Sequence, residues 1–243
     1  MKDPKFQATT WQTLIQFSKE NKFFKPKDKI LVGLSGGADS VALLHFISQL
    51  AKKYQFFVYA CHIDHQLRPN SKEDAAFAKA YAKTLGLECL VKKVNVKALA
   101  KKEKKSIEHA ARTLRYKAFE EAAKKFNCTK IALAHHADDN IETFFLNILR
   151  GTKAKGLCGI PVERAAGKYK IIRPFLCITR EQIKSYLKHF NLKNVEDQTN
   201  QEDIYQRNWL RLKLIPLMLK KQPLLKQHIL AITSELSKQL KQK

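Results

Sequence analysis

The stretch Ser35-Gly36-Gly37-Ala38-Asp39-Ser40 brings two hydroxyls, two adjacent glycines and one carboxylate together. The two glycines can adopt backbone angles that are closed to other residues, and they let the main chain approach a ligand. A helix beginning near Ala38 would direct its unpaired N–H groups and its positive dipole end at the same point. With the two serine hydroxyls as further donors, this combination is typical of a cradle for a phosphate group.

A polyphosphate would need more than this loop, because a helix dipole stabilises one charge by only about 0.3–1 kcal/mol. Asp39 is the candidate carboxylate for Mg²⁺, since hard cations prefer oxygen ligands. The stretch is neither a Walker A loop nor a Rossmann G-x-G-x-x-G loop. The alternative is a glycine-rich turn with a purely structural role.

Two more groups of polar residues follow apolar runs that read as strands. The first group is His62, Asp64, His65 and Arg68; the second is His135, His136, Asp138 and Asp139, with Glu142 following on the next helix. In parallel sheets, ligands bind beyond the carboxyl ends of the strands, so we expect all these residues to line one crevice. An alternative is a two-metal phosphoesterase, because His and Asp clusters suit metals, but this would leave the glycine loop without a role.

Basic residues on two helices are further candidates for the site. Arg112 and Arg115 lie three residues apart and share a helix face, where a guanidinium could neutralise charge on a reacting phosphate. Their alternative role is an ion pair with Glu108 or Glu120. A later helix begins with Arg207, Asn208 and Arg211, which we expect to contact substrate across the crevice.

The elements that would position these residues alternate in type along the chain. Expected strands are 29–34, 56–64, 89–96, 130–136 and 171–175, where Pro174 confines the last to an edge or a strand end. Expected helices are 7–20, 38–54, 71–85, 106–126, 139–149 and 179–190. This order predicts an α/β fold with a parallel five-stranded sheet flanked by helices.

The regions outside this alternation are more polar. The lysine-rich stretch 96–106 reads as a mobile linker, and 191–203 reads as a polar loop. Helices over 204–218 and from Pro223 onward would form a small C-terminal extension. We therefore predict a catalytic domain over 1–190 and an appendage over 191–243.

The charge of the chain restricts its partners. It has 46 Lys and Arg against 22 Asp and Glu, a net charge of +24, which attracts polyanions such as RNA or DNA. A lysine-rich surface that only maintains solubility is the alternative. The five cysteines form no C-x-x-C pair, which argues against a zinc ribbon and fits a reducing cytoplasm. We expect neither a signal peptide nor a membrane span.

Several motifs carry a resemblance to one family. SGGADS resembles the pyrophosphatase loop of the N-type ATP pyrophosphatases, the PP-loop enzymes with an adenine nucleotide alpha hydrolase-like fold. Segments 62–77, 106–116 and 134–151 resemble motifs of the tRNA(Ile)-lysidine synthetases. The segments 156–161, 173–176, 196–200 and 207–216 follow in the family's order. A related group that thiolates tRNA cytidine would be expected to carry the C-x-x-C pairs that this chain lacks.

The resemblance implies an ATP-dependent ligase. The family attaches free L-lysine to C2 of the wobble cytidine in a tRNA(Ile) with a CAU anticodon, through an adenylated cytidine, and releases AMP and pyrophosphate. Residues 35–40 would bind pyrophosphate and Mg²⁺, and His135, or less favourably His62, would face the ATP phosphates. Residues Asp64, His65, Arg68, Arg207, Asn208 and Arg211 would contact the lysine or the tRNA. A homodimer is expected by analogy only.

The carboxylates Asp138, Asp139 and Glu142 fit a lysine substrate, whose ammonium groups need anionic partners. One of them could also take the proton from the ε-amine, which must be neutral to attack. In the alternative role, Asp139 caps its helix. Many members of the family continue into further tRNA-binding domains, and here we expect the lysine-rich C-terminal helix to contribute to tRNA binding. A non-catalytic RNA-binding module is the remaining alternative, and it would leave the three polar groups unexplained.

Overall fold

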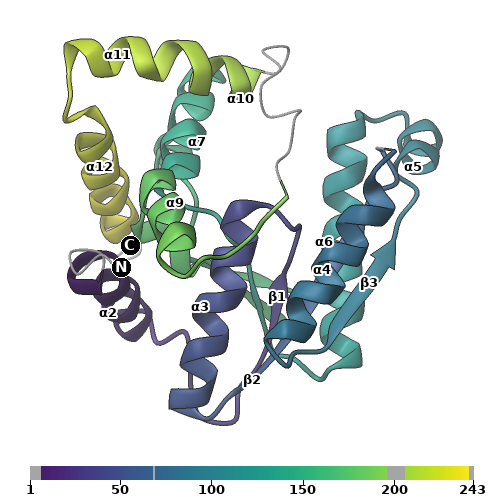
Figure 1. Cartoon of the computed structure of the whole chain (residues 1–243). Helices are drawn as coiled ribbons and strands as arrows, with labels where there is room; N and C mark the ends of the chain where they lie inside the picture. The colour runs from purple at the N-terminus through teal and green to yellow at the C-terminus, as the bar shows by residue number, and fades with distance from the viewer. Residues whose placement is uncertain (1–6, 68, 196–205, 241–243) are drawn as a thin grey trace.

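The computed structural model describes residues 7–67, 69–195 and 206–240. At its centre is a six-stranded sheet with the order β3-β2-β1-β4-β6-β5. Among these strands, Figure 1 labels β1, β2 and β3. Five strands are parallel: β1 (Lys29–Gly33), β2 (Phe57–Asp64), β3 (Cys89–Lys93), β4 (Lys130–Ala132) and β6 (Tyr169–Ile172). The predicted α/β fold with a parallel sheet is therefore confirmed.

The predicted strand count is wrong by one. The extra strand, β5 (Glu163–Ala166), pairs antiparallel with β6 at the edge of the sheet. Its sequence, Glu-Arg-Ala-Ala, has no apolar alternation, and most of it is exposed. Its place in the sheet comes from the tight turn at Gly167, which folds it back onto β6.

Both faces of the sheet are covered by helices. Along β1, Ile30 and Val32 enter one hydrophobic core and Leu31 enters the other, as the two-residue period of a strand requires. Four helices contribute to the first core: α2 (Gln12–Glu20), α3 (Ala38–Tyr54), α4 (Ser71–Thr84) and α9 (Arg180–His189). The second core is closed by α6 (Ile107–Lys125). Burial on both faces explains why β1 is a continuous apolar run.

Gly33 lets α6 lie close to the sheet. A Cβ atom built at this position would lie 2.7 Å from Cζ of Phe119, a contact that real Cβ atoms do not make. Gly33 is the last residue of β1, so the contact fixes α6 beside the start of the Ser-Gly-Gly loop.

The lysine-rich stretch predicted to be a linker contains a helix. This helix, α5 (Val96–Glu103), begins at Asn95, whose side-chain oxygen accepts a hydrogen bond from the N–H of Ala98 at 3.0 Å. Val96 and Ala100 lie four residues apart and are buried against Ala110 and Ala111 of α6. The linker prediction is wrong because these two apolar positions are enough to dock one helix turn despite the surrounding lysines.

The chain after β6 builds a third core on α7 (Ala137–Leu149). A 3₁₀ turn (Pro174–Cys177) leads to α9, so Pro174 follows the strand end, as predicted. The last elements are α10 (Gln206–Trp209), a π-helical segment (Leu210–Leu214), α11 (Ile215–Lys221) and α12 (Leu225–Gln239). Leu210, Ile215 and Ile229 pack on Ile141 and Leu146 of α7, and Figure 1 shows α11 and α12 beside that helix. In the described part of the chain, no helix is long and apolar enough to cross a membrane.

Candidate functional site

The loop between β1 and α3 is held in shape by Ser40. The Ser40 hydroxyl accepts hydrogen bonds from the N–H groups of Ser35, at 3.1 Å, and Gly36, at 3.2 Å, and donates to the carbonyl of Gly37 at 2.9 Å. Gly36 has a φ of 93°, in the left-handed region that favours glycine. The Ser40 side chain thus braces the loop from inside, and its predicted contact with phosphate stays a prediction.

The start of α3 is open to an anion. Gly37 is the N-cap residue and no side chain caps the helix, so the N–H groups of its first turn, from Ala38 onward, are left for a ligand or water. The Ser35 hydroxyl lies 3.0 Å from that of Ser40 and accepts the N–H of Gly37 at 3.3 Å. The predicted phosphate cradle therefore has the backbone geometry that anion binding needs.

Asp39 lies in the first turn of α3 with one oxygen lacking a partner. Its Oδ1 atom is buried and has no hydrogen-bond partner in the structure, and its Oδ2 lies 3.8 Å from Nε2 of His136. Burial raises the pKa of the Asp39 carboxyl, and the nearby His136 opposes that rise. A buried, unpartnered carboxylate oxygen fits a hard cation such as Mg²⁺, which commonly takes one or two protein carboxylates together with substrate phosphates.

The alternative of a two-metal phosphoesterase gains no support from the described residues. Within them, no group of three or more His, Cys, Asp or Glu residues is arranged to hold a metal ion. A Mg²⁺ site in which the protein supplies the Asp39 carboxylate alone does not need such a group of three residues.

His136, which we expected to line the crevice but gave no specific role, lies with its Nε2 atom 3.8 Å from Oδ2 of Asp39. It is the N-cap of α7: its Nδ1 accepts the N–H of Asp139 at 3.4 Å, and its own N–H donates to Oδ2 of Asp139 at 2.9 Å. This capping box directs Nε2 toward Asp39. The alternative role of Asp139 as a cap is met in part: Asp139 is the third residue of the helix, not its N-cap, but its carboxylate accepts the N–H of the N-cap residue. We predicted that this helix begins at residue 139, two residues later than it does in the structure, and so missed His136 as the residue that precedes it.

The two histidines predicted to face ATP have different surroundings. Nδ1 of His135 lies 3.3 Å from Nε of Arg173, which donates to it, and burial lowers the pKa of His135 to about 4. Its imidazole is therefore neutral near pH 7. His62 is buried, and its Nδ1 donates to the carbonyl of Leu34 at 2.9 Å, which ties β2 to the start of the loop.

The three predicted carboxylates lie together on the first two turns of α7, and each is paired with a cation. Arg207 donates from Nη2 to Asp139, at 2.8 Å, and from Nε to the buried Glu142, at 2.6 Å. Lys226 of α12 donates to Oδ1 of Asp138 at 2.6 Å. The backbone N–H of Arg180 donates to Oδ2 of the same carboxylate at 2.8 Å. The structure thus confirms the grouping of the acids and adds Lys226, which no local pattern in the sequence indicated.

The remaining predicted residues are less closely associated with this group. Asp64 is buried and accepts the N–H of Gln66 at 2.9 Å, so it shapes the turn after β2. His65 is half-buried beside it, and Arg68 lies outside the described residues. Arg211 donates to Asn208 at 3.3 Å, within one turn after Arg207.

Arg112 and Arg115 lie on the half of α6 that is nearer the carboxyl ends of the strands. Within the described residues, neither forms an ion pair with Glu108 or Glu120. The Arg112 guanidinium lies 5.2 Å from the ring centre of Tyr116 instead. The ion-pair alternative is therefore not borne out by these side chains.

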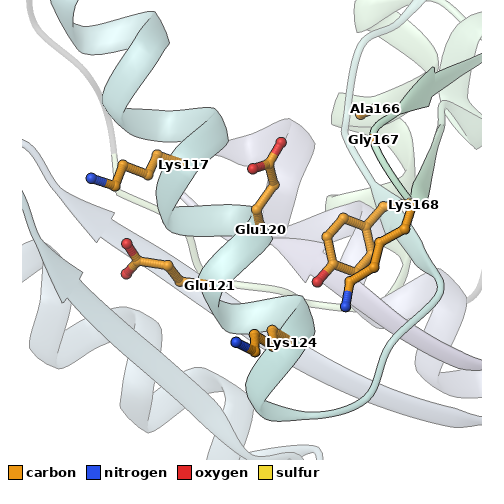
Figure 2. Close-up of a pocket in the computed structure, with 8 residues that line it drawn as sticks. Lys117, Glu120, Glu121, Lys124, Ala166, Gly167 and Lys168 are labelled. Atoms are coloured by element: carbon orange, nitrogen blue, oxygen red, sulfur yellow. The ribbon is translucent and has the colours of Figure 1, made fainter.

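A separate hollow of about 380 Å³ lies at the other end of the sheet (Figure 2). Its lining is Lys117, Glu120, Glu121, Lys124, Ala166, Gly167, Lys168 and Tyr169. These residues belong to the C-terminal half of α6 and to the turn before β6, and so to the amino ends of the parallel strands. None of the predicted site residues lies there, so this hollow is not the candidate site.

Comparisons with known proteins agree with this geometry. The family model ATP_bind_3, described as a PP-loop domain, matches residues 7–218. A tRNA(Ile)-lysidine synthase from Clostridium perfringens is 43% identical over 207 residues, which are 84% of this chain and 43% of that protein. The corresponding synthase from Petrotoga mobilis is 40% identical over 215 residues, which are 88% of this chain and 68% of that protein. The chain thus spans less than half of some relatives and about two thirds of another.

Two solved structures share the fold. The U34-tRNA thiolase NcsA from Methanococcus maripaludis, solved with its [4Fe-4S] cluster, superposes with a TM-score of 0.77 at 17% identity, over 93% of this chain and 78% of that one. An NH3-dependent NAD synthetase from Campylobacter jejuni gives 0.55 at 16% identity, over 96% and 94% of the two chains. At these identities the likeness concerns the fold alone.

Proposed function

This chain belongs to the tRNA(Ile)-lysidine synthase family of PP-loop proteins, and from that membership we propose that it attaches L-lysine to the wobble cytidine of a tRNA(Ile) with a CAU anticodon. The reaction would consume ATP and release AMP and pyrophosphate. The observation that carries this proposal is the position of an uncapped helix start, with Asp39 in its first turn, next to the Arg207–carboxylate group.

In the first step, the C2 oxygen of cytidine would bond to the α-phosphorus of ATP while the bond from that phosphorus to the departing pyrophosphate breaks. The N–H groups at the start of α3 would hold the pyrophosphate. Asp39 would hold Mg²⁺ through its unpartnered oxygen, and the bound ion would neutralise phosphate charge. Neutral His135 could offer a hydrogen bond to a phosphate oxygen from its Nε2–H, because its Nδ1 accepts from Arg173.

In the second step, the ε-amine of lysine would bond to C2 as the C2–O bond breaks and AMP leaves. Free lysine carries a carboxylate and two ammonium groups, and the group formed by Arg207, Asp139 and Glu142 offers both charges in return. The Arg207 guanidinium suits the substrate carboxylate, whereas the acids suit an ammonium group. One acid would accept the proton that the ε-amine must lose before it attacks.

The C-terminal helices would help to bind the tRNA, through the excess of positive charge along the chain. Because the reaction needs tRNA, ATP and free lysine together, we place it in the cytoplasm. The possible homodimer can be tested by measuring the molar mass in solution.

The direct test is turnover of ATP to AMP and pyrophosphate, with each of L-lysine and the CAU-bearing tRNA supplied or left out. We expect turnover only with both present, a lysine-modified cytidine in the nuclease digest of the tRNA, and loss of both signals in Asp39→Ala. AMP formation with a different nucleophile, or without tRNA, would retain the loop chemistry and favour another tRNA-modifying PP-loop enzyme. Absence of AMP under every condition would contradict the proposal.

A further inference from the structure

Three arginines from three separate segments surround one tyrosine. The guanidinium carbon of Arg112, on α6, lies 5.2 Å from the ring centre of Tyr116, and that of Arg164, on β5, lies 5.1 Å from it. Arg173, which follows β6, interacts with the same tyrosine. Burial lowers the pKa of the Arg173 guanidinium, and the interaction with Tyr116 opposes this lowering. We refer to Arg112, Arg164, Arg173 and Tyr116 as the arginine cluster.

Arg173 is a buried cation whose hydrogen-bond partners among the described residues include a carbonyl and a neutral imidazole. It is 3% exposed, and it donates to the carbonyl of Pro161 at 2.6 Å and to Nδ1 of His135 at 3.3 Å. In the described part of the chain no carboxylate forms an ion pair with any of the three arginines. Burying a charge without a counter-charge is costly, so an anion bound from outside would be strongly favoured.

Arg173 links the cluster to His135 near the ATP side of the crevice, whereas Arg164 lies farther from the glycine loop. Arg164 pairs with Ile171, near the carboxyl end of β6, and β5 lies three strands away from β1. Neighbouring strands are about 4.8 Å apart, which places β5 roughly 14 Å from the strand that leads into the loop. Both positions open toward the same edge of the sheet, so two separate phosphate groups could bind there together.

We propose that the arginine cluster is a binding subsite for a phosphodiester group of the RNA strand, close to the nucleotide that reacts at the crevice. This inference rests on the proposed function, which makes RNA the substrate, and adds the residues that hold its backbone. Guanidinium groups match phosphate oxygens in a bidentate manner, and Arg112 and Arg164 are exposed and accessible to a long polyanion. The phosphates of ATP are the other possible source of such a group, and the experiment separates the two.

The test compares Arg164→Ala with Lys168→Ala. Lys168 is a matched control, because it lies on the same hairpin with its ammonium 5.4 Å from the ring centre of Tyr169, but at the amino end of the sheet. The dissociation constant of a CAU-bearing tRNA transcript is measured at several salt concentrations. We expect Arg164→Ala to weaken binding and to reduce the slope of log K against log salt by about one. We expect Lys168→Ala to retain the wild-type slope.

Two further measurements make the result decisive. ATP affinity without RNA should be unchanged in Arg164→Ala, and Arg164→Lys should keep most of the salt slope because it keeps the charge. An unchanged slope in a folded Arg164→Ala would overturn the inference. So would a loss of ATP affinity with RNA binding intact, which would assign the cluster to ATP.

These binding measurements need no lysine and no turnover. If no AMP forms but Arg164→Ala still changes the slope, then the proposed reaction fails and the RNA subsite stands. If AMP forms normally and the slope does not change in Arg164→Ala, the proposed reaction stands and the RNA subsite fails.

Discussion

Asp39 is a residue whose charge is unfavourable in the folded protein without its ligands. Burial raises its pKa, so the ionised form costs stability at every pH above its usual range near 3.8. We expect Asp39→Asn to raise the melting temperature of the ligand-free protein at pH 7, by about 2–4 °C for each kcal/mol gained. The same change should lower AMP formation by roughly 10²–10³, the usual effect of removing one placed electrostatic group.

Asp74→Asn is the control, because Asp74 also lies in the first turn of a helix, α4. It should leave turnover unchanged. A melting temperature of Asp39→Asn that falls at pH 7 would show that the carboxylate is stabilised by contacts within the protein, contrary to the expected effect of its burial.

Gly37 and Gly36 should respond differently to an added methyl group. At Gly37 the nearest atom to a built Cβ is Oγ of Ser35 at 3.5 Å, an ordinary contact, and the backbone is extended. We expect Gly37→Ala to fold with unchanged stability but to raise the KM for ATP about tenfold or more, because the methyl group displaces phosphate from the N–H groups.

Gly36→Ala should instead lose at least about 1 kcal/mol of stability, because its φ of 93° suits glycine. Thermal melts and ATP kinetics on both variants test the pair. Normal ATP kinetics in Gly37→Ala would place the phosphates elsewhere.

Two buried histidines predict how stability depends on pH. Burial lowers the pKa values of His45 and His135 to about 4, from an ordinary value of 6.5. Between these values the unfolded chain binds protons that the folded chain does not, so the free energy of unfolding should fall as pH falls from 6.5 toward 4. The slope should approach about 1.4 kcal/mol per pH unit for each histidine.

Urea denaturation at several pH values measures this slope. His135→Asn, which keeps an acceptor for Arg173, should reduce it, whereas replacement of the exposed His109 should not. Equal slopes in wild type and His135→Asn would contradict the assignment.

At this scale the sequence was sufficient for residues whose role depends on near neighbours. The glycine loop and the acids of α7 could be predicted because their residue types and spacing lie within a few positions. The contacts of His136 with Asp39 and of Lys226 with Asp138 could not, because they join distant segments of the chain. From the sequence we assigned His135 to the ATP phosphates, and only the capping box shows that the ring of the neighbouring His136 is directed toward Asp39.

At the scale of elements, α12 is attached to α7 by a charge pair as well as by apolar packing. Nζ of Lys226 lies 2.6 Å from Asp138, and both side chains are largely shielded from solvent. We expect a double-mutant cycle of Lys226→Met and Asp138→Asn to give a coupling of about 1–2 kcal/mol in the free energy of unfolding. Urea denaturation of the four proteins supplies the values.

Glu181 provides the control for this cycle. It lies 3.8 Å from the same ammonium but is 71% exposed, so its coupling with Lys226 should be near zero. Equal coupling for Asp138 and Glu181 would mean that the pair does not hold α12 in place.

The elements that the sequence predicted well are those that bury a strong apolar pattern. The strands over 29–34 and 56–64 and the long helix over 106–126 were placed to within about two residues. Missed elements, β5 and α5, are short and rich in charged residues, so tertiary pairing rather than their own pattern determines their structure. Strand β4 is shorter than predicted because the chain leaves the sheet after Ala132.

For the whole molecule, the core on α7 joins the two parts that we predicted as a catalytic domain and a C-terminal appendage. Ile141 and Leu146 come from the first part, and Leu210, Ile215 and Ile229 from the second. We therefore expect one cooperative thermal transition, with the calorimetric enthalpy equal to the van't Hoff enthalpy. Ile229→Ala should lower its midpoint without splitting it. Two transitions, only one of them sensitive to Ile229→Ala, would instead support independent domains.

The position of the antiparallel strand β5 has a consequence for variation within this fold. This strand pairs with β6 alone, and the glycine loop follows β1, at the middle of the sheet. A hairpin at the edge of the sheet can be lengthened, given other side chains or exchanged without changing the order of the central strands. If the proposed RNA subsite is correct, exchange of the β5–β6 hairpin between two members of the family should change the RNA that is bound and leave the strand that leads into the glycine loop intact.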